Sequence, residues 1–128
     1  MKLSRLIPAL FAVAAIAITT AVIADENHEI IEKVMKEGLK GDESPLAKVL
    51  EGGASKDDTA GLAKLIKTMD GTKAPAGDQA DYDKKVAELI AAMDAVAGGA
   101  TDEKALGRLD KASNCKACHT DHKPKKKD

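Results

Sequence analysis

The sequence predicts an all-α protein whose body is an antiparallel bundle of four helices. Apolar residues recur at three- and four-residue intervals along four segments, which is the spacing of one face of an α-helix. Short stretches with glycine and proline separate these segments, and no segment alternates apolar and polar residues as a strand would. Amphipathic helices joined by short loops are typical of antiparallel four-helix bundles.

The first 24 residues are predicted to be an export signal that is removed, which leaves residues 25–128 as the domain. Lys2 and Arg5 precede an uncharged stretch, and Val22 and Ala24 satisfy the rule for residues before a cleavage site. In a bacterium the domain would then work in the periplasm. An uncleaved membrane anchor is the alternative, because the uncharged stretch approaches the length of a membrane span.

The first helix of the bundle is expected over residues 26–40, and a short helical piece is expected over 45–52. Two glycines weaken the end of the first helix. Ser44 is the expected N-cap of the short piece and Pro45 its first residue. The apolar face of the first helix consists of Ile30, Ile31, Val34, Met35 and Leu39.

The second and third helices each carry an apolar face, and that of the third is the clearest in the sequence. Ser55 is expected to cap the second helix, which Gly71 ends, and the third helix runs from Tyr82 to a pair of glycines at 98–99. The two faces consist of Leu62, Leu65, Ile66 and Met69 in the second helix, and of Val86, Leu89, Ile90, Met93, Val96 and Ala97 in the third.

The fourth helix is expected to begin after Thr101 as its N-cap and to continue through the two cysteines of the chain. On one continuous helix Cys115, Cys118 and His119 stand at i, i+3 and i+4 and share a face. The apolar stripe that leads into them predicts that this face points to the bundle interior. The residues of that stripe are Leu106, Leu109 and Ala112.

Composition supports a large apolar group in the core and argues against several classes of function. Tyr82 is the only aromatic residue outside the predicted signal, so the core must be built from aliphatic side chains and methionine. The net charge is −1 with both signs interspersed, which argues against nucleic-acid binding. No nucleophile–base pair, phosphate loop or paired-carboxylate signature stands out, so no enzymatic activity is expected.

The segment Cys115-Lys-Ala-Cys118-His119 has the spacing at which haem is attached covalently. The two thiols would bond to the vinyl groups of the porphyrin, and the histidine would reach the iron. A disulfide between the cysteines and a zinc site are the alternatives, with His122 and either His119 or His28 completing the zinc ligands. Haem is favoured because the disulfide would close a very small loop, and zinc ligands usually come from two separated pairs.

The export signal, the four helices and this motif near the C-terminus resemble the cytochrome c′ family, the class II c-type cytochromes. The segment Val-Met-Lys at 34–36 is similar to the part of the family's first helix that crosses the distal face of the haem. After the haem histidine the family commonly has an aromatic residue and an arginine at the third and fourth positions. This chain has His122 and Lys123 there.

The resemblance implies a role for each residue of the motif and for one methionine. Cys115 and Cys118 would be the thioether anchors of one haem c, and His119 would be the proximal ligand of its iron. Met35 falls where the family places the residue over the other face of the iron. The family often forms homodimers through its first two helices, so a homodimer is a further expectation.

Two haem functions follow from the two possible roles of Met35. Ligation by its sulfur gives a low-spin electron carrier with an unidentified redox protein as partner. If Met35 only packs over the iron, a five-coordinate haem would bind nitric oxide or carbon monoxide. Met69 and Met93 are the other candidate ligands. A zinc-binding bundle is the more distant alternative.

Overall fold

The computed structural model describes residues 19–124, with side chains from residue 26 onward, and every regular element in that range is a helix. Most of the predicted export signal therefore lies outside the described residues, and its last six positions, 19–24, form the start of the first helix. In chain order the elements are α1 (Thr19–Val34), η1 (Met35–Leu39), α2 (Pro45–Leu50), α3 (Lys56–Lys67), α4 (Gln79–Ala97), α5 (Glu103–Ala112) and α6 (Cys115–His122).

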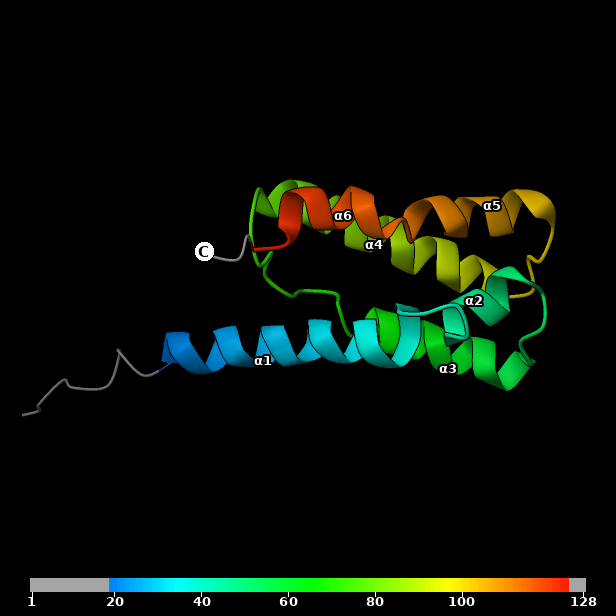
Figure 1. The fold of residues 1–128 in the computed structure, drawn as a ribbon, viewed down its shortest axis with the longest axis horizontal. Coiled ribbons are helices and arrows are strands. Elements are labelled where there is room, and N and C mark those ends of the chain that lie inside the picture. The colour runs from blue at the N-terminus through cyan, green and yellow to red at the C-terminus, as the bar shows by residue number, and fades with distance from the viewer. Residues whose placement is uncertain (1–18, 125–128) are drawn as a thin grey trace, which may run out of the picture.

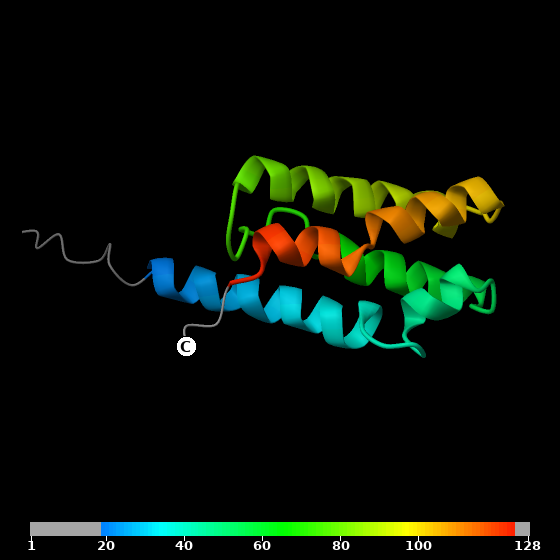
Figure 2. The same cartoon turned by 45° about the horizontal axis from the view of Figure 1, so that its top comes forward.

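Four helical rods lie side by side and run in alternating directions (Figure 1). They are α1 with η1, α3, α4, and α5 with α6, while α2 is a short insertion at the turn between the first two rods. Figure 2 shows α6 on the side of the bundle that also carries α1. The predicted all-α bundle is confirmed. No helix in the described part of the chain is both long enough and apolar enough to cross a membrane.

The first rod ends in a π-helical turn rather than in the α-helix that the sequence predicts. The N–H of Lys40 donates to the carbonyl of Met35 at 2.8 Å, which is an i→i+5 bond. Gly38 is buried within this turn, and a Cβ there would lie 3.0 Å from a methyl carbon of Leu62 and of Leu65. The turn therefore lets the backbone of η1 come very close to α3.

The expected N-caps of α2 and α3 are confirmed. Ser44 Oγ accepts from the N–H of Ala47 and Ser55 Oγ accepts from the N–H of Asp58, each at 3.1 Å. These bonds satisfy N–H groups that have no partner within the helix. The third rod begins three residues earlier than expected, because Asp78 rather than a later residue caps α4.

The fourth rod differs from its prediction at two points. Asp102 precedes α5 as its N-cap residue, so the expectation that Thr101 caps this helix is wrong. The rod is also broken at Ser113–Asn114, where Asn114 Oδ1 accepts from the N–H of Ala117 at 3.1 Å and starts α6. Asparagine favours this capping geometry over a helix interior, which explains the break. The cysteine motif therefore opens a new helix.

The core is formed by residues of α1 with η1, α2, α3, α4 and α5, and it is almost wholly aliphatic. The predicted seam of α4 is confirmed for Val86, Leu89, Met93 and Val96, which are buried. Its other two residues, Ile90 and Ala97, are half-buried and pack against the core. Tyr82 is buried too, and its hydroxyl shares a 2.7 Å hydrogen bond with Thr72. The remaining buried apolar residues are Val34, Leu39, Leu46, Val49, Leu62, Ala63, Ile66, Met69, Ala92 and Leu109.

Candidate cofactor site

One cavity brings together the cysteine motif and two of the three candidate methionines. Cys115, Cys118 and His119 line it from α6, Met35 lines it from η1, and Met69 lines it from the turn after α3. Its other walls are largely apolar and include Leu39, Val86, Leu89 and Ala112. Residues from both ends of the domain thus meet at one place, as the cofactor prediction requires.

The motif forms the wall of this cavity and does not point into the bundle core. Cys118 is half-buried, whereas Cys115 and His119 are exposed. The expectation that all three face the interior is therefore wrong. The break before α6 is the reason, because it ends the apolar stripe of α5 and turns the new helix so that His122 becomes its buried residue.

Only two methionines remain candidates as a second axial ligand. Met35 is half-buried, and Met69 is buried at the edge of the cavity. Met93 is completely buried in the core and does not line the cavity.

Both cysteines are free thiols, so the disulfide alternative is not formed in this structure. The Cys115 thiol donates weakly to the carbonyl of Ser113, with a sulfur–oxygen distance of 3.7 Å. Burial raises the pKa of the Cys118 thiol above its ordinary value. Cys118 is therefore held as a protonated thiol near neutral pH and is a weak nucleophile until it is activated.

The cavity itself is small, about 40 Å³, but two larger hollows adjoin it. A groove of about 290 Å³ between α4 and α5–α6 shares Asn114 and Cys118 with the cavity. A second groove of about 620 Å³, between η1–α2 and α5–α6, shares Leu39 and Cys115. Sites for large organic ligands usually measure roughly 300–1,000 Å³. A macrocycle would therefore fit these residues only if Met35 and Leu39 move away from α6.

The packing of α6 allows such a movement. Among the described helices, α6 packs chiefly on α4, while the large contacts of the core join α3, α4 and α5. The donor set also fits a haem, because two thiols, an imidazole and a thioether surround one mostly apolar space. Separating η1 from α6 would widen this space and leave the contacts of α4 with α3 and α5 in place.

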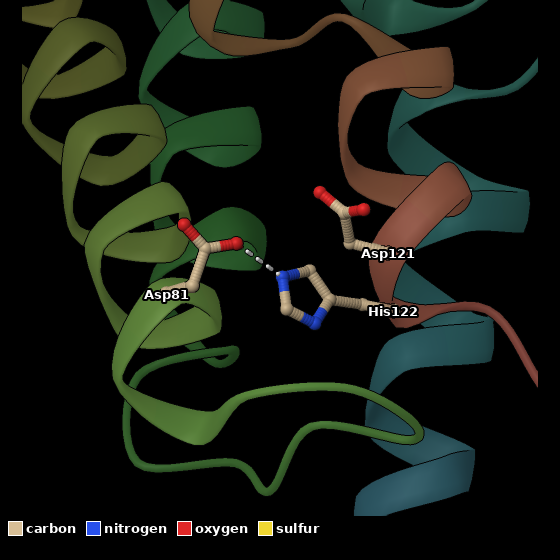
Figure 3. A group of neighbouring side chains, drawn as sticks. All are labelled: Asp81, Asp121 and His122. Carbon is tan, nitrogen blue, oxygen red and sulfur yellow. Dashed lines mark hydrogen bonds and ion pairs between the residues drawn. The ribbon is translucent and has the colours of Figure 1, made fainter.

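A hydrogen-bonded network fixes the end of α6 to α4 and to the loop before α4. His122 is buried, and its Nδ1 lies 2.9 Å from the carbonyl oxygen of Ala76. Its Nε2 lies 2.9 Å from a carboxylate oxygen of Asp81 (Figure 3). Both partners are acceptors, so a ring that carries a proton on each nitrogen donates to both. The ring also packs edge-on against Tyr82, with centroids 5.4 Å apart.

Lys85 completes this network. Its ammonium lies 2.9 Å from Asp81 and 2.8 Å from Asp121, and it donates to the carbonyl of Ala117 in α6 at 3.2 Å. The hydrogen bond with Lys85 is the main cause that lowers the pKa of the Asp81 carboxyl below its ordinary value, and the hydrogen bond with His122 is the second. The sequence suggests His122 as a possible zinc ligand at a position where the family has an aromatic residue. It does not reveal the role in this network, since the partners of His122 are 41 and 46 residues away.

The structure does not assemble the predicted zinc ligands. The only group of three metal-ligating side chains within 4.8 Å of one another in residues 26–124 is Asp81, Asp121 and His122, and it contains neither cysteine. The Lys85 ammonium already lies between the two carboxylates, where a metal cation would have to bind. His28 is exposed on α1 and faces Glu32 at 3.8 Å.

Comparisons of the chain with protein-family models, with curated proteins and with solved structures gave no match. The function must therefore be inferred from the motif, from its cavity and from the network that fixes α6.

Proposed function

We propose that the protein is a periplasmic c-type cytochrome that carries one haem on Cys115 and Cys118 and transfers single electrons. The observation that supports this most is the position of Met35. The methionine that the sequence suggests as the second axial ligand lines the same cavity as the two cysteines and His119, although it lies on a different helix.

The residues that line the site would have separate roles. Cys115 and Cys118 would form the two thioether bonds, and His119 would donate an imidazole nitrogen to the iron. When bound, the haem supplies a one-electron couple at that iron. Met35 sulfur would stabilise the ferrous state and raise the potential. Leu39, Val86 and Leu89 would keep water from the iron because they provide apolar walls.

Binding of a diatomic gas is the second candidate, and the residues that line the cavity support it. The walls near Met35 are apolar, and the cavity contains no arginine or tyrosine that would stabilise bound dioxygen. If Met35 packs over the iron without binding it, nitric oxide or carbon monoxide would bind in a site lined by aliphatic side chains. Oxygen storage and peroxidase chemistry have no support from these residues.

The visible absorption spectrum tests the proposal and separates the two candidates. The protein is produced in a host with c-haem maturation and measured oxidised, reduced, and reduced with carbon monoxide. Sharp, split bands in the reduced form that do not respond to carbon monoxide are expected for an electron carrier. A broad reduced band that shifts with carbon monoxide would instead identify a gas binder.

A variant with both cysteines changed to serine is the control for covalent attachment. Haem should remain with the wild-type chain after denaturation in acid and acetone, and it should be extracted from the Cys115→Ser, Cys118→Ser variant. A wild-type chain with no haem would refute the proposal, and zinc content would then be measured.

A further inference from the structure

The groove between α4 and α5–α6 is lined by more cations than anions, although the chain as a whole has a net charge of −1. Four of its lining residues are cationic and one is anionic, Glu88. The cations are Lys84, Lys85, Arg108 and Lys111. A groove lined by one sign of charge attracts ligands of the other sign and raises their rate of encounter.

Two of these cations are not paired within the protein. Lys85 binds Asp81 and Asp121, and Arg108 binds Glu88 through two bonds of 2.7 and 3.1 Å. Lys84 and Lys111 are exposed and have no ion-pair partner among the described residues. They therefore leave positive charge available at the rim of the groove for an external carboxylate.

The floor of the groove adjoins the candidate cofactor site. Cys118, the half-buried cysteine of the motif, lines both this groove and the cavity with Met35. Small side chains, Ala112 and Ala117, lie beside it. An electron-transfer partner in the groove would thus approach the attached macrocycle at the Cys118 side. Electron transfer falls steeply with distance, so this is the favourable place for exchange.

We infer that this groove, with Lys84 and Lys111 at its rim, docks an acidic surface of a redox partner protein and that electrons pass at the Cys118 side. The inference rests on the proposed function, because it requires a haem on Cys118. A protein fits better than an anionic membrane, because the cations surround a concave groove and no large apolar side chain projects from it for insertion into lipid.

The first test locates anion binding without using the haem. Isotope-labelled protein is titrated with hexacyanochromate(III), a paramagnetic anion, and line broadening of backbone amide signals is recorded. Broadening should be strongest for Lys84, Lys111 and Ala117, and it should disappear in the Lys84→Glu, Lys111→Glu variant. Broadening spread evenly over all lysines, or unchanged in this variant, would overturn the inference.

A matched variant separates this groove from general charge effects. Lys33→Glu, Lys64→Glu makes the same change in net charge at a groove between α1 and α3, where both lysines are exposed and Glu37, Asp57 and Asp58 lie nearby. It should leave the broadening around Lys84 and Lys111 in place. Sedimentation with phosphatidylglycerol vesicles that depends on Lys84 and Lys111 would also overturn the inference, in favour of a membrane.

The second test measures electron exchange by the haem-bearing protein. Reduced protein gives one electron to hexacyanoferrate(III), which becomes hexacyanoferrate(II), or to tris(phenanthroline)cobalt(III), which becomes the cobalt(II) complex. Lys84→Glu, Lys111→Glu should slow the reaction with the anion about tenfold at low salt and speed that with the cation, because steering depends on charge. Lys33→Glu, Lys64→Glu should have little effect on either rate.

The outcomes of the second test separate the two proposals. Haem-bearing protein whose rates respond equally to both double variants would overturn the docking site and leave the proposed function intact. Protein without haem would refute the proposed function, and the docking site as a place of electron exchange would fall with it.

Discussion

Met35 decides between electron transfer and gas binding. Changing Met35 to alanine is expected to convert the low-spin spectrum of the haem-bearing protein into a high-spin one that reacts with carbon monoxide, because the sulfur ligand is lost. Absorption spectra of the reduced variant with and without carbon monoxide measure this. Met93→Leu is the control, since Met93 is buried away from the cavity and leucine nearly conserves its volume. An unchanged spectrum in Met35→Ala would contradict ligation.

His122 stabilises the protein by fixing α6. Phenylalanine at this position would keep the ring against Tyr82 but lose the hydrogen bonds to Ala76 and Asp81. Urea unfolding of His122→Phe is expected to show a loss of about 1–2 kcal/mol in the free energy of unfolding. In the haem-free protein with Cys115 changed to serine, alkylation of Cys118 should also become faster.

Glu88→Gln is the matched control for His122→Phe. It removes a carboxylate that pairs with Arg108 and joins α4 to α5, without touching α6. Alkylation of Cys118 should stay slow in this variant. Equal alkylation rates in the Cys115→Ser protein with and without His122→Phe would show that the histidine does not hold α6 in place.

At the level of residues, the sequence predicts the chemistry of the motif but not the network beside it. The spacing of Cys115, Cys118 and His119 is local, so it can be read directly. The role of His122 depends on a carbonyl and a carboxylate from distant parts of the chain. No periodicity or motif connects these residues before the chain is folded.

Among the elements, η1 is sensitive to substitution at Gly38, where its backbone comes close to α3. A methyl group on Gly38 would lie 3.0 Å from methyl carbons of Leu62 and Leu65. Both leucine side chains must shift to admit this methyl group, and the overpacking should outweigh the gain of about 0.5–1 kcal/mol of alanine over glycine in a helix. Gly38→Ala is therefore expected to lower the free energy of unfolding by up to about 2 kcal/mol. Urea unfolding at neutral pH measures it.

Gly61→Ala is the opposite case on the facing helix. Gly61 is exposed within α3, and a Cβ there would meet no atom within 4 Å. Alanine should stabilise α3 by about 0.5–1 kcal/mol because it reduces the freedom of the unfolded backbone. If Gly38→Ala and Gly61→Ala changed the free energy of unfolding in the same direction, close packing of η1 on α3 would not explain the effect of Gly38→Ala.

The local sequence predicts the N-caps of α2 and α3, but it does not predict where the first and fourth rods depart from a regular α-helix. Ser44 and Ser55 cap through bonds to residues three positions later, so the local sequence is enough. The π-helical turn after Val34 goes with the close approach of η1 to α3, and the break at Ser113–Asn114 goes with the capping bond of Asn114. Both differ from a regular α-helix by a small change in hydrogen bonding, and helical periodicity does not distinguish them.

For the whole molecule, the bundle is predictable because each rod has one apolar face to bury. The apolar stripe of α4 fixes which of its residues lie in the core, and the structure agrees. The position of α6 is not predictable in this way, since its single fully buried side chain is a histidine. Polar contacts rather than an apolar face determine how this helix packs.

Stability of the whole molecule should fall in acid through three carboxyl groups. Neighbouring cations lower the pKa of each carboxyl below its ordinary value of 3.8 for aspartate or 4.5 for glutamate. The pairs are Glu32 with Lys36, Asp81 with Lys85, and Glu88 with Arg108. Because the folded pKa is the lower one, their contribution is complete above about pH 4.5 and is lost as the pH falls further. The urea midpoint should be level from pH 7 to 5 and then decline, less so in high salt.

The loss of stability at alkaline pH should differ between protein with haem and protein without it. Burial raises the pKa of Cys118 and Tyr82 above their ordinary values of 9.0 and 10.0, and bonds to Asp121 and Asp81 raise that of Lys85. A raised folded pKa gives stability that is complete below the unfolded pKa and is lost as the pH rises. Haem-free protein should therefore lose stability from about pH 9, where Cys118 is half ionised in the unfolded chain. A thioether does not ionise, so haem-bearing protein should keep a level urea midpoint until about pH 10, as should haem-free Cys118→Ala. The same alkaline onset in all three proteins would show that the Cys118 thiol is not the group that titrates.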